Sequence, residues 1–127
     1  MRNRLFAALS ISWCACYAGA GRYSWTPIKL HGWTVNPDTN CYQGRGADEV
    51  LDVYMSTITG EVNRPDAGAV ALLKCRMRCD SRRRDGCMAF TVHPSALGSL
   101  HCWLRKDVHL AACDRDATRF YTYTRWA

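Results

Sequence analysis

The sequence lacks the short motifs by which many enzymes are assigned. No serine lies in a nucleophile elbow, and His93, His101 and His109 have no partners spaced for a catalytic triad. No Cys-x-x-Cys pair is present, which argues against a thioredoxin-like redox centre. We therefore expect a protein that is not an enzyme and that carries no cofactor.

Repeats, low-complexity tracts and Asn-x-Ser/Thr sites are also missing, so N-glycosylation is not expected. One apolar run, LFAALSISWCACYA at residues 5–18, has no second of its length in the chain. It is shorter than the ~20 apolar residues that cross a bilayer comfortably. The chain is therefore expected to have no membrane span once this run is removed.

The first 20 residues have the features of a secretory signal peptide. Arg2 and Arg4 give a charged start, the apolar run follows, and AGA at residues 18–20 forms a small-x-small cleavage site. An uncleaved anchor and a buried helix are the alternatives. We expect a secreted protein, exported along the secretory pathway, whose mature chain begins near Gly21.

Cleavage at that site changes the cysteine count. Of the eight cysteines, Cys14 and Cys16 leave with the signal. An even number in a small exported chain predicts a disulfide framework. The six that remain are Cys41, Cys75, Cys79, Cys87, Cys102 and Cys113. Removing 20 residues from 127 leaves 107, enough for one domain with a modest core, and the loss of two arginines lowers the net charge from +6 to +4.

One helix is predicted, with Asp66 as its N-cap and AGAVALLKCRMRC at residues 67–79 as its body. Val70, Leu73 and Met77 fall at i, i+3 and i+7, which places them on one apolar stripe of the helix. The arginines concentrate toward the far end, where positive charge suits the helix dipole.

Several strands accompany the helix. Residues 87–92 alternate, with Cys87, Ala89 and Thr91 on one face, and the two small side chains would let the helix approach that face. A turn at Asp85-Gly86 precedes this strand. Further strands are expected at residues 33–35, 50–55, 102–105 and 120–125. The order of elements predicts an α+β fold with an antiparallel sheet.

Cys75 and Cys79 stand at i and i+4, on the same face of the predicted helix. Their Cβ vectors run roughly parallel, so each should reach a partner on a neighbouring element rather than bond the other. Cys87 and Cys102, both on predicted strands, are the natural partners, which leaves the first and last of the six to close the framework. A zinc site made from these four cysteines and His101 is the alternative, and an oxidising compartment argues against it.

A helical CRMRC, a CMAF strand, a CWLRKDV strand, Cys113 and a closing FYTYT follow one another in this order. With this pattern the chain from Cys41 to about Tyr123 resembles the PAN/apple domain family. The resemblance implies a sheet of about five antiparallel strands with one helix packed across it, in a domain over residues 41–127. Residues 21–40 lie outside the resemblance and are expected to form an N-terminal extension packed on the domain.

The resemblance also implies a nested disulfide pairing, in which the first cysteine bonds the last, the second the fifth and the third the fourth: Cys41–Cys113, Cys75–Cys102 and Cys79–Cys87. PAN/apple domains recognise proteins and glycans and share no catalytic residues. The resemblance therefore supplies no site to carry over, and candidate binding residues must come from this sequence itself.

The strongest candidate site is a basic cluster at the end of the helix: Arg76, Arg78, Arg82, Arg83 and Arg84. Arginine presents a fixed fork of donors that matches sulfate, phosphate and carboxylate, so the cluster predicts a site for a heparin-like or other acidic ligand. A solvated helix end, partly neutralised by Asp80 and Asp85, is the alternative.

A second candidate is a sugar-stacking face made of aromatic side chains, for which burial in the core is the alternative: Trp25, Trp33, Trp103, Tyr121 and Tyr123. The functional hypothesis is a secreted, disulfide-rich recognition module that binds a protein or an acidic glycan, with no nucleic-acid partner and no metal. The alternative is a structural subunit of an extracellular or organellar assembly, and a homo-oligomer is compatible with either.

We predict that export removes residues 1–20. N-terminal sequencing of the exported protein is expected to read GRYSW, because the small-x-small site ends at Ala20. A mature chain that still begins at Met1 would contradict the signal peptide, and with it the count of six mature cysteines.

Overall fold

The computed structural model of the chain describes residues 26–50, 56–59, 67–95 and 99–127, with the side chains of 56–59 and Ala67 not described. Four of the expectations above fall on other residues. They are the signal peptide, the Asp66 helix cap, the Trp25 candidate and the strand predicted at residues 50–55, of which only Val50 is described.

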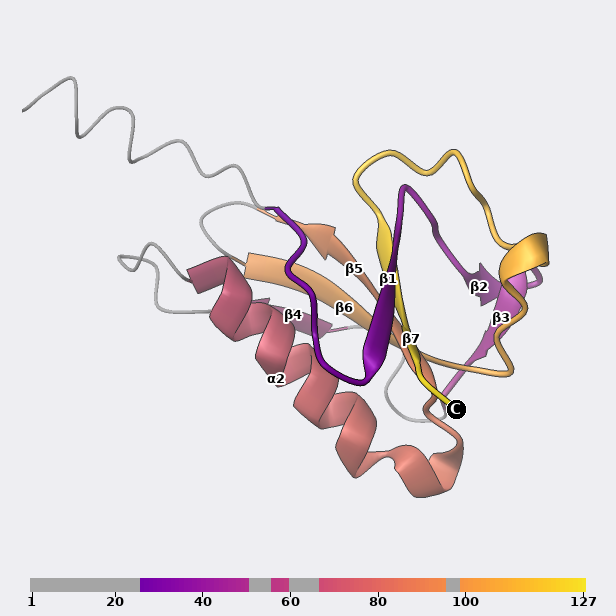
Figure 1. Ribbon diagram of the computed structural model, residues 1–127, viewed down its shortest axis with the longest axis horizontal. Coiled ribbons are helices and arrows are strands. Elements are labelled where there is room, and N and C mark those ends of the chain that lie inside the picture. Colours follow the sequence, from indigo (N-terminus) through magenta and orange to yellow (C-terminus); the bar gives the residue numbers. More distant parts are fainter. Residues whose placement is uncertain (1–25, 51–55, 60–66, 96–98) are drawn as a thin grey trace, which may run out of the picture.

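The core of the protein is a sheet crossed by one α-helix (Figure 1). The strands are β1 (Trp33–Pro37), β2 (Tyr42–Gln43), β3 (Gly46–Glu49), β4 (Ser56–Thr59), β5 (Ala89–Pro94), β6 (Ser99–Lys106) and β7 (Tyr121–Arg125). Their order is β1-β7-β5-β6-β3-β2, and β4 also pairs with β6. β6 therefore has β5 on one edge and has β3 and β4, one after the other, on its second edge.

The α+β class is confirmed, whereas the prediction of about five antiparallel strands is wrong in number and in one pairing. Seven strands lie within the described residues, and β2 runs parallel to β3. Gly44 and Gly46, with φ angles of 83° and 85°, turn the chain tightly enough for these two strands to lie side by side. Strands of two and four residues are too short to show a period in the sequence.

The N-terminal segment forms part of the sheet. The strand predicted at residues 33–35 is observed as β1, which pairs antiparallel with β7 along five residues. Leu30 and Trp33 are both buried in the main core. The strands predicted at 102–105 and 120–125 are also present, as parts of β6 and β7.

The main core lies between the sheet and α2 (Ala67–Ser81), which packs against β4, β5 and β6. From the sheet it includes Phe90, Leu104 and Tyr123. The Phe90 ring stacks on Tyr123 at 5.0 Å between centroids, and Trp33 lies 4.9 Å from Phe90. Such aromatic pairs contribute about 0.5–1.5 kcal/mol each beyond the apolar area that they bury.

The helix presents a different face to the sheet from the stripe that its period suggested. Ala71, Leu72 and both helical cysteines are fully buried. Leu73 and Met77, by contrast, are 37% and 61% exposed, so their stripe faces solvent. The reason is geometric, since the cysteines at i and i+4 bond to β6 and to the segment before β5, so that both must point toward the sheet and the stripe is turned outward.

The prediction that the helix approaches the Ala89 and Thr91 face of the strand is also wrong. Phe90 and Val92 lie in the core beneath the helix. The Thr91 hydroxyl is instead 2.8 Å from that of Thr122 on the opposite face, where the Thr122 hydroxyl donates to the Thr39 carbonyl at 2.9 Å. The large apolar residues of the strand, rather than the small ones, meet the helix because they supply the area that the core buries.

Three disulfides hold these layers together. Cys75–Cys102 joins α2 to β6, and Cys79–Cys87 joins the end of α2 to the segment before β5. Cys41–Cys113 closes a second, smaller core with Ala47, Val108 and Leu110. These are the pairs that the PAN/apple resemblance implied, and the zinc alternative fails because its sulfur atoms are bonded to one another.

We predict that Gly46 tolerates alanine far less well than Gly44. Both residues have positive φ, so each Gly→Ala change costs roughly 1–2 kcal/mol of folding stability. A Cβ on Gly46 would also lie 2.5 Å from Cys113 Sγ and 2.8 Å from the His109 carbonyl, whereas one on Gly44 would meet nothing within 4 Å. Overpacking of this kind costs a further ~1–3 kcal/mol. Urea unfolding of G46A and G44A measures the difference, and equal losses would contradict the close packing around Cys113.

Candidate anion-binding site

The arginine-rich loop begins where α2 ends. The Arg82 amide donates to the carbonyls of Arg78 and Cys79, and a 3-10 turn, η1 (Arg83–Asp85), follows. Gly86 ends the turn in the left-handed region at φ 89°, and the Cys87 amide returns to the Arg82 carbonyl at 3.2 Å. With the Cys79–Cys87 disulfide, the loop is closed at both ends.

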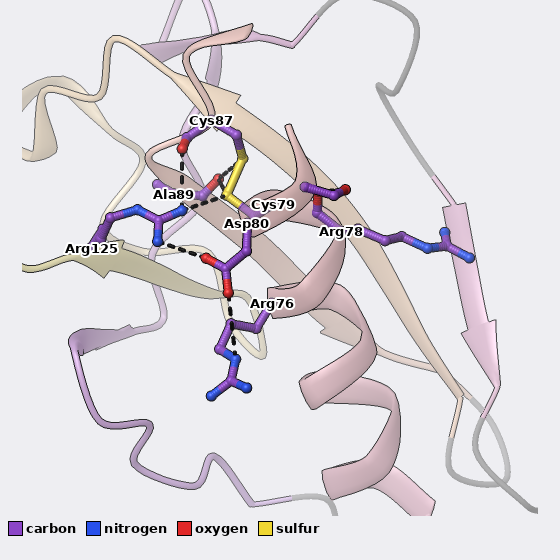
Figure 2. A network of polar contacts seen from close by, with 8 residues as sticks. Arg76, Arg78, Cys79, Asp80, Cys87, Ala89 and Arg125 are labelled. Carbon is purple, nitrogen blue, oxygen red and sulfur yellow. Dashed lines mark hydrogen bonds and ion pairs between the residues drawn. A yellow bond between two sulfur atoms is a disulfide. The ribbon is translucent and has the colours of Figure 1, made fainter. Parts of the chain in front are cut away.

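The structure divides the five predicted arginines into two groups. Arg76 and Arg78 are two residues apart on a helix and point to opposite sides of it (Figure 2). Arg82, Arg83 and Arg84 are consecutive in the closed loop. The candidate site is therefore these three loop arginines, which we call the arginine loop, and not the cluster of five.

The arginine loop has an excess of positive charge. Arg82 pairs with Asp85 at 2.8 Å, while Arg83 and Arg84 are exposed and have no ion-pair partner among the described residues. Three arginines against one aspartate leave two positive charges. The stem of the Lys106 side chain lies beside the loop, since a Cβ on Gly86 would be 3.6 Å from it. Fixed backbone and uncompensated charge are the properties that an anion site needs.

Arg76 belongs to a structural network rather than to the site (Figure 2). Asp80 is 3.9 Å from Arg76 and 2.6 Å from Arg125 of β7. The Arg125 guanidinium also donates to the Cys87 carbonyl and lies 4.4 Å from the centre of the Trp33 ring. Arg125 ties the helix end to the sheet, and no local pattern shows this, because only the pairing of β7 with β5 brings it there.

The aromatic candidates do not form one face. Trp33 and Tyr123 are buried in the core, so the prediction of a sugar-stacking face is wrong for both. The Tyr123 hydroxyl donates to the Ile28 carbonyl at 2.7 Å, and burial raises its pKa. Tyr121 packs against the same core, and Trp25 lies outside the described residues. Trp33 and Tyr123 are buried because both side chains lie on the side of the sheet that packs against the helix.

Trp103 lies instead on the face of the sheet away from α2, in a cluster with two histidines. His93 and His101 are opposite one another on β5 and β6, with 6.3 Å between ring centres. Phe120 is 4.5 Å from His93 and 5.9 Å from Trp103. The i, i+2 spacing of His101 and Trp103 in β6 is the sequence signal for this grouping, although the strand was predicted to begin only at Cys102.

Arg105, in the same strand, is buried rather than available to a ligand. Its Nε donates to the Cys41 carbonyl at 2.6 Å, and its Nη1 to Glu49 at 3.2 Å. Burial lowers the pKa of Arg105, and Glu49 opposes that effect. The residue therefore joins β6 to the smaller core around Cys41.

The described residues contain no group of three or more histidine, cysteine or acidic side chains that could hold a metal ion. Within the same residues, no helix is long and apolar enough to cross a membrane. The chain matches no protein-family model, no curated protein sequence and no solved structure. The PAN/apple resemblance accordingly stays a prediction.

We predict that His93 makes folding stability depend on pH. Its pKa is lowered from 6.5, first by partial burial and then by nearby Arg119 and His101. The unfolded chain therefore takes up a proton more readily, so this contribution to stability is complete above about pH 6.5 and is lost as the pH falls below it. Urea unfolding at pH 7.5 and 5.5 should show a smaller drop for H93Q than for wild type. H109Q, an exposed control, should behave as wild type, and an unchanged drop in H93Q would contradict the assignment.

Proposed function

We propose that this chain is a secreted, disulfide-stapled recognition module of PAN/apple type that binds an acidic glycan through the arginine loop. The observation that carries the proposal is the exposure of Arg83 and Arg84 on a turn closed by a disulfide. Arginine's fixed fork of donors matches paired anionic oxygens, which a heparin-like chain carries on its carboxylates and sulfates.

The closed backbone of the loop should favour binding in addition to the effect of its positive charge. The Cys79–Cys87 bond and the Arg82–Cys87 backbone hydrogen bond hold the turn in place before any ligand arrives. Less conformational entropy is then lost on binding than from a flexible basic tail. Because the arginines are at the surface, the attraction should weaken as salt is raised. The proposed interaction is therefore electrostatic and moderate rather than tight.

We predict that the triple variant R82S/R83S/R84S loses retention on a heparin column. R83S/R84S should lose most of it, because Arg82 is already engaged by Asp85. The thermal midpoint should change little in either variant, since exposed charges contribute roughly 0–1 kcal/mol to stability. Elution position in a salt gradient and a thermal melt measure the two effects.

A matched control removes three positive charges elsewhere on the surface. Lys29, Arg45 and Arg115 are all exposed and lie outside the loop. K29S/R45S/R115S should elute close to wild type if the loop is a site, whereas an equal shift would show that heparin responds only to net charge. Retention that survives R82S/R83S/R84S would reject the proposal, and unfolding of that variant would assign the arginines to structure instead.

A further inference from the structure

Arg83 and Arg84 leave the arginine loop in different directions. They are successive residues of the 3-10 turn η1. A 3-10 helix has three residues per turn, so neighbouring side chains leave its axis about 120° apart. Both side chains are exposed, and neither has an ion-pair partner in the part of the chain that the structure describes. The turn therefore favours a ligand with two separate anionic groups over a single anion that both guanidinium forks would have to share.

Lys106 places another positive charge beside the same loop. It is the last residue of β6, and the Met88 amide just after the loop donates to the Arg105 carbonyl at 3.0 Å, which brings the loop to the end of that strand. A Cβ on Gly86 would lie 3.6 Å from both Cβ and Cδ of Lys106. The ammonium is two single bonds of about 1.5 Å beyond Cδ, so it lies within roughly 7 Å of that point.

The ammonium of Lys106 is open to a ligand. The residue is half-buried because its stem packs against the loop, and a lysine in such a position keeps its charged end in water. Asp48 lies opposite Lys106 in the register of β3 and β6, yet no ion pair to Lys106 is present within the described ranges. Three positive charges, at Arg83, Arg84 and Lys106, are thus distributed around one disulfide-closed loop.

We propose that the arginine loop and Lys106 form one site for a polyanionic glycan chain, whose anionic groups are repeated along it, and that Lys106 is a binding residue of that site. The proposal rests on the glycan function proposed above. Separate groups of the chain meet Arg83, Arg84 and Lys106, so the chain passes around the loop and across the end of β6. A terminal sugar with one carboxylate meets only one of these charges.

Affinity follows from the number of contacts. Each exposed ion pair improves binding by only about two- to fivefold, because water and salt screen it. Contacts along one chain multiply, so two contacts more than a singly charged sugar makes should improve binding by roughly 4- to 25-fold. The fixed backbone of the loop adds to this, since the charges need not be ordered when the ligand arrives.

Titration calorimetry of the exported protein with defined glycans tests the proposal. A sulfated hexasaccharide from heparin should bind roughly 4- to 25-fold more tightly than a sialylated trisaccharide with one carboxylate. K106M keeps an apolar stem against the loop but lacks the ammonium, so it should bind the hexasaccharide about two- to fivefold more weakly at an unchanged thermal midpoint. K106R should bind as wild type does. K29M is the matched control, since Lys29 is exposed in the segment before β1.

The salt dependence of the affinity reports the number of contacts directly. Each contact to a polyanion releases bound counterions, and for nucleic acids each changes the slope of log Kd against log salt by about 0.7–0.9. K106M, R83S and R84S should each lower the slope for the hexasaccharide by about that amount, whereas K29M should leave it unchanged. Loss of a merely structural side chain would not change this slope.

The outcomes separate this proposal from the function on which it rests. A hexasaccharide that does not bind wild-type protein would reject the glycan site itself. A hexasaccharide that binds no more tightly than the trisaccharide would overturn the need for repeated charge, and would leave the arginine loop as a site for single acidic sugars. An unchanged slope in K106M, or an equal fall in K29M, would remove Lys106 from the site.

Discussion

The inward direction of Cys75 and Cys79 is the constraint on which the rest of the structure depends. Bonds to Cys102 of β6 and to Cys87, two residues before β5, with Cα–Cα distances of 6.0 and 5.4 Å, hold two successive turns of α2 against the sheet. One bond would fix only the distance of the helix from the sheet. Two bonds, one turn apart, also fix its rotation about its own axis, and that rotation decides which residues reach solvent.

The three disulfides contribute differently to stability and to function. In the chain-entropy view their worth grows with the separation they close, so separations of 72, 27 and 8 residues correspond to about 4, 3–4 and 2–3 kcal/mol. Cys79–Cys87 contributes least by that measure, yet it closes the turn that carries the arginine loop. The fixed rotation of α2 has a second consequence, since it leaves Leu73 and Met77 at the surface.

The sequence predicts those parts of the structure that depend on the spacing of residues along the chain. It does not predict the parts that depend on pairing between segments far apart in the chain. Cysteines at i and i+4 predict a helix face that bonds to neighbouring elements, and the structure has it, although Cys87 lies just before β5 and not on the strand predicted for it. Apolar period alone chose the wrong face of that helix, because Leu72 and Leu73 point about 100° apart and period does not show which of the two is buried. The arginine loop was readable from its composition, whereas strand register alone brings Arg125 to the end of the helix. The short strands β2 and β3 depend on glycine φ angles that no period reports.

Disulfide mapping tests the central claim, the double clamp of the helix on the sheet, most directly. Proteolysis under non-reducing conditions followed by mass spectrometry should give three linked peptide pairs, with Cys75 joined to Cys102, Cys79 to Cys87 and Cys41 to Cys113. Six cysteines allow 15 pairings, so this outcome is unlikely by chance. A peptide with Cys75 joined to Cys79, or free thiols at these positions, would contradict the account, because nothing would then hold the cysteine face of the helix toward the sheet.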